Sequence, residues 1–138
     1  MEKIQVMIIN DSSAIQIFLE QIINSFIDCE IINLSSNGHI ALISLKHKKP
    51  DVIILDLEMP QIDGLTFLEK INGTYDIPVI IMSAYAKYGS AILDEALKIG
   101  AMDYIAPPSS RNYFEIKHFN TILHSKILKA HLTTVTKS

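Results

Sequence analysis

Five short apolar runs alternate with segments of helical spacing, and this alternation limits what the chain can fold into more than any other feature. Most of the runs are rich in valine and isoleucine, as in buried strands, and they cover residues 6–9, 30–34, 52–55, 79–82 and 102–105. The segments that follow predict helices around residues 15–23, 39–47, 66–71, 90–99 and 116–130. Strands that alternate with helices form a parallel sheet with helices on both faces. The sequence therefore predicts an α/β protein with a doubly wound, five-stranded parallel sheet.

Composition indicates a single globular domain and argues against two classes of partner. The 138 residues are 49% hydrophobic and 20% charged, which is enough for one sizeable core. The net charge of −3 gives no electrostatic reason to expect a nucleic acid partner. The N-terminal apolar run is too short to span a membrane and lacks a signal-peptide layout. Cys29 is the single cysteine, and we expect it to be a small buried apolar residue of a cytoplasmic protein.

Asp56 is the most informative polar residue of the chain. It ends the third apolar run, and Pro60 with the Asp63-Gly64 pair then predicts a turn. Ligands of open α/β sheets bind at the carboxyl ends of the strands. A carboxylate buried at such an end is costly unless a cation or a hydrogen-bond donor compensates it. Asp56 is therefore a candidate metal ligand or phosphoryl acceptor.

Polar residues also follow two other predicted strands. Asn10 and Asp11 follow the first strand, and Ser83 follows the fourth. The carboxyl ends of parallel strands share one edge of the sheet, so we expect these side chains near Asp56. Oxygen ligands of this kind suit Mg²⁺, and an aspartate beside Mg²⁺ can attack a phosphoryl group to form an acyl phosphate. Taken singly, Asp11 or Ser83 could equally be a helix N-cap.

With these motifs in place, the chain resembles the receiver domains of two-component response regulators over about residues 3–131. The matching stretches are Asn10-Asp11-Ser12, Asp56-Leu57-Glu58-Met59-Pro60 with Asp63-Gly64, Pro78 to Ala84, and Gly100 to Ile105. Within the family it is most similar to the receiver domain of the chemotaxis protein-glutamate methylesterase, as Gly64-Leu65, Phe67 to Lys70, Lys87 and Gly89-Ser90 indicate. The resemblance implies a flavodoxin-like (βα)5 fold and a place in chemotaxis signalling.

The resemblance also implies the chemistry of the site. Asp56 would accept a phosphoryl group from a phosphohistidine of a histidine kinase. Asp11, Asp56 and the backbone carbonyl of Glu58 would bind Mg²⁺, and Asn10 would bind it through a water molecule. Such a domain catalyses its own phosphorylation and dephosphorylation.

A conformational switch follows from the same resemblance. Ser83 would hydrogen-bond the phosphoryl group, and the ring of Tyr104 would rotate between exposed and buried positions in step with it. Tyr85, Tyr88 and Tyr104 would lie on the usual docking face of receivers, where aromatic side chains suit partner binding.

Two positions depart from the family pattern. Asn10 stands where a second acidic residue is usual, so Mg²⁺ affinity should fall. Pro107 stands where a lysine normally precedes Pro108, so no ammonium from that position can stabilise the phosphoryl group. Lys87 and Lys117 are possible substitutes only if loops bring them to the site.

Alternatives therefore stay open. One is a pseudo-receiver that acts as a phosphorylation-independent interaction module. Another is a hydrolase with an aspartyl nucleophile, for which Glu58 would be the second acid, although the residues after it fit the receiver pattern better. We expect the receiver domain at residues 1–131, followed at 132–138 by a polar, frayed tail or the start of a linker. No methylesterase catalytic domain fits in 138 residues, so an output domain would belong to a longer protein, and a free-standing receiver is equally compatible.

Overall fold

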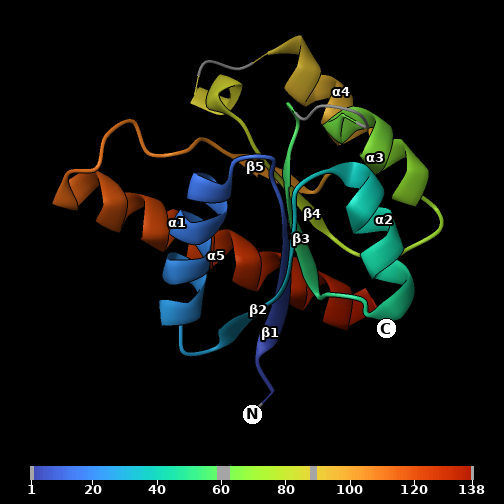
Figure 1. Ribbon diagram of the computed structural model, residues 1–138, viewed down its shortest axis with the longest axis horizontal. Helices are drawn as coiled ribbons and strands as arrows, with labels where there is room; N and C mark the ends of the chain where they lie inside the picture. The colour runs from blue at the N-terminus through green and yellow to red at the C-terminus, as the bar shows by residue number, and fades with distance from the viewer. Residues whose placement is uncertain (1, 59–62, 88–89, 138) are drawn as a thin grey trace.

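One parallel sheet of five strands forms the centre of the protein (Figure 1). The structure is a computed structural model that describes residues 2–58, 63–87 and 90–137. Its strands lie in the order β2-β1-β3-β4-β5 and pair in parallel throughout. They are β1 (Ile4–Ile9), β2 (Cys29–Ser35), β3 (Val52–Asp56), β4 (Val79–Met82) and β5 (Asp103–Ile105). The order places β3 at the centre of the sheet, as the apolar run before Asp56 predicts.

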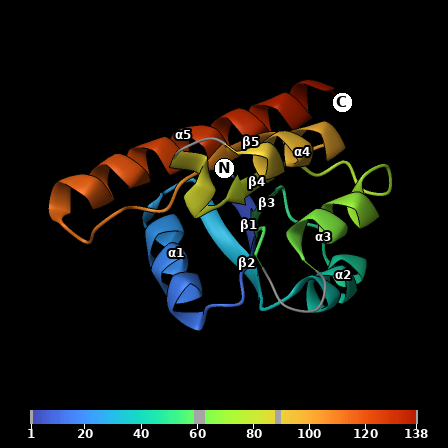
Figure 2. The ribbon, with the colours of Figure 1, turned by 90° about the horizontal axis from the view of Figure 1, so that it is seen from above.

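Helices cover both faces of the sheet, which confirms the doubly wound fold. They are α1 (Ser13–Ser25), α2 (Gly38–His47), α3 (Gly64–Ile71), α4 (Ala91–Ile99) and α5 (Tyr113–Lys137), with a short 3₁₀ helix, η1 (Ala84–Lys87). Seen from above, α1 and α5 lie on one side of the sheet and α2 and α3 on the other (Figure 2).

The core consists of two apolar layers, one on each face of the sheet. Side chains alternate between the faces along a strand, so Val6 and Ile8 of β1 join the layer under α1 and α5. Met7 and Ile9 join the layer under α2, α3 and α4. This alternation explains why nearly continuous apolar runs are needed: both faces of each strand are buried.

Side-chain caps set the beginnings of all five α-helices described. Each cap accepts a hydrogen bond from a backbone N–H three residues later, which satisfies a donor that the helix itself leaves unpaired; the caps are Ser12, Asn37, Asp63, Ser90 and Asn112. Because Ser12 caps α1, Asp11 is not the cap of this helix, and the carboxylate of Asp11 remains available for other contacts.

The structure differs from the expected elements mainly near the C-terminus. A frayed end was expected after residue 131, but α5 continues to Lys137. The hydroxyl groups of Thr133 and Thr134 donate to the carbonyls of Lys129 and Ala130 within this last part of the helix. Where the domain ends stays a prediction. Within the residues described, no helix is long and apolar enough to cross a membrane.

Candidate functional site

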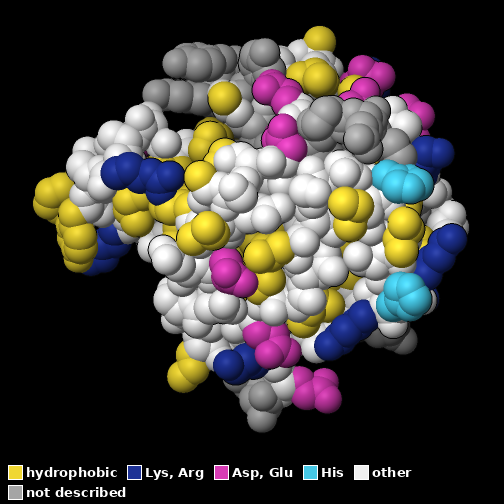
Figure 3. All heavy atoms as spheres, viewed as in Figure 1, with side chains coloured by type: hydrophobic (Ala, Val, Ile, Leu, Met, Phe, Trp, Pro, Cys, Tyr) yellow, Lys and Arg dark blue, Asp and Glu magenta, His cyan; other side chains and the backbone are white. Residues whose placement is uncertain are grey.

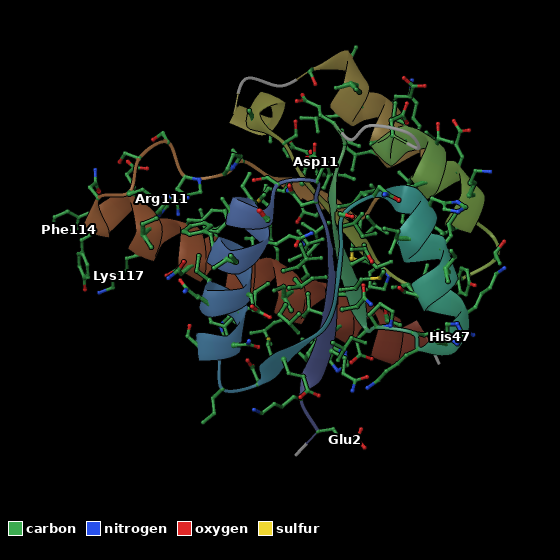
Figure 4. All side chains as sticks on the ribbon, viewed as in Figure 1. Glu2, Asp11, His47, Arg111, Phe114 and Lys117 are labelled. Carbon is green, nitrogen blue, oxygen red and sulfur yellow. The ribbon has the colours of Figure 1, made fainter. Side chains whose placement is uncertain are left out.

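The strand register brings the predicted site residues to one edge of the sheet. Ile9 pairs with Leu55 across β1 and β3, so Asn10 follows β1 beside Asp56. Asp56 itself pairs with Met82 across β3 and β4, and Ser83 comes next in the chain. Figure 4 shows Asp11 at this edge, at the opposite end of the sheet from Glu2. The convergence expected from the sequence is therefore present.

Asp56 is a partly buried carboxylic acid with a strongly raised pKa. Burial is the largest cause, and the charges of Asp11 and Glu58 add to it; together they raise the pKa of Asp56 to about 6. One interaction opposes them, since the backbone N–H of Glu58 donates to Asp56 Oδ1 at 3.0 Å. A carboxylate in this setting gains from any cation placed beside it.

The donor set of this edge fits Mg²⁺. Asp11 is exposed and lies close enough to Asp56 for a side-chain hydrogen bond and a charge interaction to raise the Asp56 pKa. Mg²⁺ binds proteins through one or two carboxylates and keeps several of its water ligands. It would relieve the repulsion between these two carboxylates, and its water ligands would lie on the exposed side. The side chain of Glu58 is exposed, and the family resemblance implies the backbone carbonyl of this residue as a further ligand.

Asn10 is buried and held in place by hydrogen bonds. Only 3% of its surface is exposed, and its side-chain carbonyl accepts a hydrogen bond from the N–H of Ser12 at 2.9 Å. A carbonyl oxygen has a second lone pair, so an additional bond to a metal-bound water is chemically open to it. The sequence suggested no role for Gln16, yet its Nε2 donates to the backbone carbonyls of Asn10 at 2.7 Å and Ser35 at 3.1 Å. Gln16 thus fixes the β1–α1 turn from one helical turn away.

Ser83 follows β4, and Tyr104 lies on the adjacent strand, β5. Ser83 is 6% exposed, and its backbone N–H donates to the carbonyl of Ile105 at 3.1 Å. Tyr104 pairs with Ile81 and exposes 38% of its surface, so its ring is in an outward position. A groove of about 510 Å³ lies beside this ring, between β5, the loop after it and α5.

Of the two predicted substitutes for the missing lysine, the structure describes the side chain of Lys117 alone, and that side chain supplies no cation here. Pro107 lines the groove beside Tyr104. Lys117 lies at the outer end of α5, with its Nζ 5.7 Å from the ring centroid of Tyr113, and points away from Asp11 (Figure 4). The side chains of Lys87, Tyr85 and Tyr88 are outside the described part of the chain. Acidic side chains gather over the upper part of the molecule (Figure 3).

Comparison with known proteins agrees with this geometry. Residues 6–116 match the family described as response regulator receiver domain. A protein-glutamate methylesterase/protein-glutamine glutaminase of group 3 operon from Bradyrhizobium diazoefficiens is 41% identical over 107 residues, 78% of this chain and 30% of that protein. The corresponding protein of Bdellovibrio bacteriovorus is 42% identical over 108 residues, again 78% of this chain and 30% of that protein. The chain thus spans about a third of the length of these curated relatives.

Solved structures give the same result. The response regulator domain of Thermotoga maritima CheB is 32% identical with a TM-score of 0.84, covering 94% of this chain and 97% of that one. A chain in the crystal structure of the P1 domain of CheA3 in complex with CheY6 from R. sphaeroides is 25% identical with a TM-score of 0.78, covering 94% of this chain and 98% of that one. On the site geometry, the family match and these structural neighbours together, the chain belongs to the response regulator receiver domain family.

Proposed function

We propose that this chain is a phosphorelay receiver in which Asp56 accepts a phosphoryl group from a phosphohistidine of a histidine kinase. The observation that carries the proposal is the position of Asp56. This residue is partly buried at the carboxyl end of the central strand, has Asp11 beside it, and has a pKa raised to about 6. A carboxylate that is costly to keep charged is a good place for a cation and a phosphoryl group.

The transfer itself needs few groups. One oxygen of Asp56 attacks phosphorus, the phosphorus–nitrogen bond of the phosphohistidine breaks, and the leaving imidazole takes up a proton. The N–H of Glu58 holds Oδ1 of Asp56 at 3.0 Å, which leaves Oδ2 for the attack. Water later hydrolyses the aspartyl phosphate, which releases inorganic phosphate and restores the carboxylate.

Mg²⁺ is part of the proposal. Asp11, Asp56 and the backbone carbonyl of Glu58 would hold it, with Asn10 bonding to one of its water ligands. Bound there, the ion offsets the negative charge that gathers on the phosphoryl oxygens. Asn10 contributes no charge, so binding should be weaker than with an acidic residue at this position.

Output would come through Ser83 and Tyr104. We propose that Ser83 hydrogen-bonds the phosphoryl group and that the Tyr104 ring, outward in this structure, turns inward when it does. The similarity to methylesterase receivers supports a role in chemotaxis, with the kinase of that system as donor. The receiver would act in the cytoplasm, either joined to an output domain in a longer protein or free-standing.

One observation favours a second function. Pro107 takes the place of the usual lysine and lines the groove beside Tyr104, so a cation that normally neutralises the phosphoryl group is missing there. The alternative is a pseudo-receiver that binds its partner without phosphate.

Phosphorylation by a small acyl phosphate separates the two functions. Wild-type protein with Mg²⁺ should gain the mass of one phosphoryl group, and Asp56→Asn should gain none. Asp63→Asn is the matched control, because it changes a nearby aspartate while asparagine still caps α3. Absence of any gain in a wild-type protein whose circular dichroism shows an intact fold would favour the pseudo-receiver.

A further inference from the structure

A second cluster of metal-ligating side chains lies at the opposite edge of the sheet from Asp56. Cys29 is the first residue of β2, Asp28 precedes it, and His124 comes from the middle of α5. Cys29 pairs with Ile4 at the start of β1, while Asn10 follows the end of that strand. At about 3.3 Å per residue, the cluster is about 20 Å from the phosphorylation site, so it is a separate feature of the fold.

The three side chains bring sulfur, nitrogen and oxygen together. His124 Nε2 lies 2.8 Å from Asp28 Oδ1, and the Cys29 thiol donates to the same oxygen at 3.4 Å. One ligand atom from each of the three residues lies within 4.8 Å of the other two. A search of the described residues for three or more histidine, cysteine or acidic side chains whose ligand atoms all lie this close together finds this group.

These separations are close to those of a tetrahedral zinc site. Zinc–ligand distances of about 2.0 Å for nitrogen or oxygen and about 2.3 Å for sulfur imply contacts of about 3.3 Å between nitrogen and oxygen and about 3.5 Å between sulfur and oxygen. The observed 2.8 Å and 3.4 Å differ from these by about half an ångström or less. The third pair, Cys29 Sγ and His124 Nε2, lies within 4.8 Å and must come to about 3.5 Å for an ion to bind all three ligands.

The surroundings fix the orientation of the ligands before any ion arrives. The Phe26 ring stacks on the imidazole of His124, with centroids 4.4 Å apart and an interplanar angle of 26°. The backbone carbonyl of Asp28 accepts from the N–H of Ile4 at 2.7 Å, and the N–H of Cys29 donates to the carbonyl of Phe26 at 3.1 Å. The stack holds the plane of the His124 ring, and the two backbone hydrogen bonds hold the segment that carries Asp28 and Cys29.

Solvent reaches the cluster on the side of His124 and Asp28. Cys29 is 1% exposed, whereas the side chains of His124 and Asp28 are 32% and 20% exposed. Three protein ligands with one open side leave room for a water molecule as the fourth ligand. A mixed set with one thiolate, one imidazole and one carboxylate suits Zn²⁺ better than Mg²⁺ or Ca²⁺, which prefer oxygen alone.

We propose that Asp28, Cys29 and His124 bind one Zn²⁺ ion, with water as the fourth ligand. Binding replaces the thiol proton of Cys29, which passes to solvent, and the ion then joins α5 to the segment between α1 and β2. Competition with this proton lowers the affinity, so the site is weaker than a closed structural site with several thiolates.

Cobalt gives a direct test because the chain has a single cysteine. Metal-free wild-type protein, kept reduced, is titrated with Co²⁺ while the near-ultraviolet thiolate-to-cobalt charge-transfer band is recorded, and then with Zn²⁺ by calorimetry. We expect the band, which can come only from Cys29, and one Zn²⁺ per chain. Zn²⁺ should also raise the melting temperature by several degrees. Absence of the band in folded wild-type protein would overturn the proposal.

Variants test two of the three ligands. Cys29→Ala and His124→Gln should each weaken Zn²⁺ binding by about tenfold or more. His118→Gln is the control, because it removes an exposed histidine of the same helix and should leave the affinity unchanged. Equal affinities in all three variants would mean adventitious binding to surface histidines and would contradict the site. The wild-type charge-transfer band still decides if Cys29→Ala fails to fold.

Discussion

A Cβ atom on Gly64 would lie 2.5 Å from the Cα of Leu57, the residue after Asp56, and 2.7 Å from the carbonyl oxygen of Asp56. The N–H of Gly64 also donates to the carbonyl of Leu57 at 3.0 Å. The first turn of α3 therefore packs directly on the backbone that carries the phosphoryl acceptor. Only glycine permits this approach, so the turn after β3 and the position of Asp56 depend on it.

Replacing Gly64 by alanine should disturb both stability and phosphorylation. The added methyl group must push the backbone near Asp56 aside, and overpacking of this kind costs about 1–3 kcal/mol of unfolding free energy. Gly73→Ala is the matched control: Gly73 has a φ of 82° but nothing within 4 Å of an added Cβ, so it should cost about 1 kcal/mol through backbone strain alone. Urea unfolding and the phosphorylation rate measure the two effects. Equal loss of phosphorylation in both variants would contradict the role of Gly64.

The raised pKa of Asp56 predicts how stability depends on pH. With the folded-state pKa at about 6, the unfolded chain releases this proton first as the pH rises, so the free energy of unfolding should fall between about pH 4 and about pH 6. Asp56→Asn removes this loss. Allowing for solvent screening of a partly buried group, the variant should gain about 1–2 kcal/mol relative to wild type between about pH 4 and about pH 7. The free energies of unfolding of both proteins, measured with a chelator present at about pH 4 and at about pH 7, check this. A difference between the two proteins that does not change with pH would refute it.

Asn10→Asp should strengthen Mg²⁺ binding. A third carboxylate beside Asp11 and Asp56 adds attraction for a divalent cation, and about tenfold tighter binding corresponds to about 1.4 kcal/mol. Titration calorimetry measures the affinity. Asn72→Asp adds the same charge at the exposed end of α3 and should change the affinity little. An equal gain in the two variants would show a general charge effect and not a ligand at position 10.

Pro107→Lys should restore the missing cation. If the ammonium reaches the phosphoryl oxygens, the rate of phosphorylation by an acyl phosphate should rise by about tenfold. Pro108→Lys places the same charge one residue further along and serves as control. Both positions line the groove beside Tyr104, so both variants should fold. No difference between them would show that the backbone at position 107 cannot direct a side chain into the site.

Much of the fold follows from local patterns in the sequence. The valine and isoleucine runs predict the strands because each strand is buried on both faces, and the helical spacing predicts the starts of α2 and α4 to within one residue. The convergence of Asp11, Asp56 and Ser83 also follows, because parallel order alone brings these strand ends to one edge.

Features that depend on distant contacts could not be predicted. Asp28 and His124 are 96 residues apart, and nothing local to either indicates that they meet. Gln16 looked like an ordinary helix residue, yet it bonds to the carbonyls of two different strand ends. The helical continuation of α5 to Lys137 was missed because its last residues are polar and β-branched, which local propensity disfavours in a helix.

The measurement that tests the central claim most directly is the location of the phosphoryl group. Wild-type protein is treated with Mg²⁺ and a small acyl phosphate and then with borohydride, which reduces an aspartyl phosphate to homoserine, and its peptides are sequenced by mass spectrometry. The account predicts homoserine at position 56 and nowhere else. Homoserine at Asp11 or Asp63 with Asp56 unchanged, or no homoserine in folded protein, would contradict it.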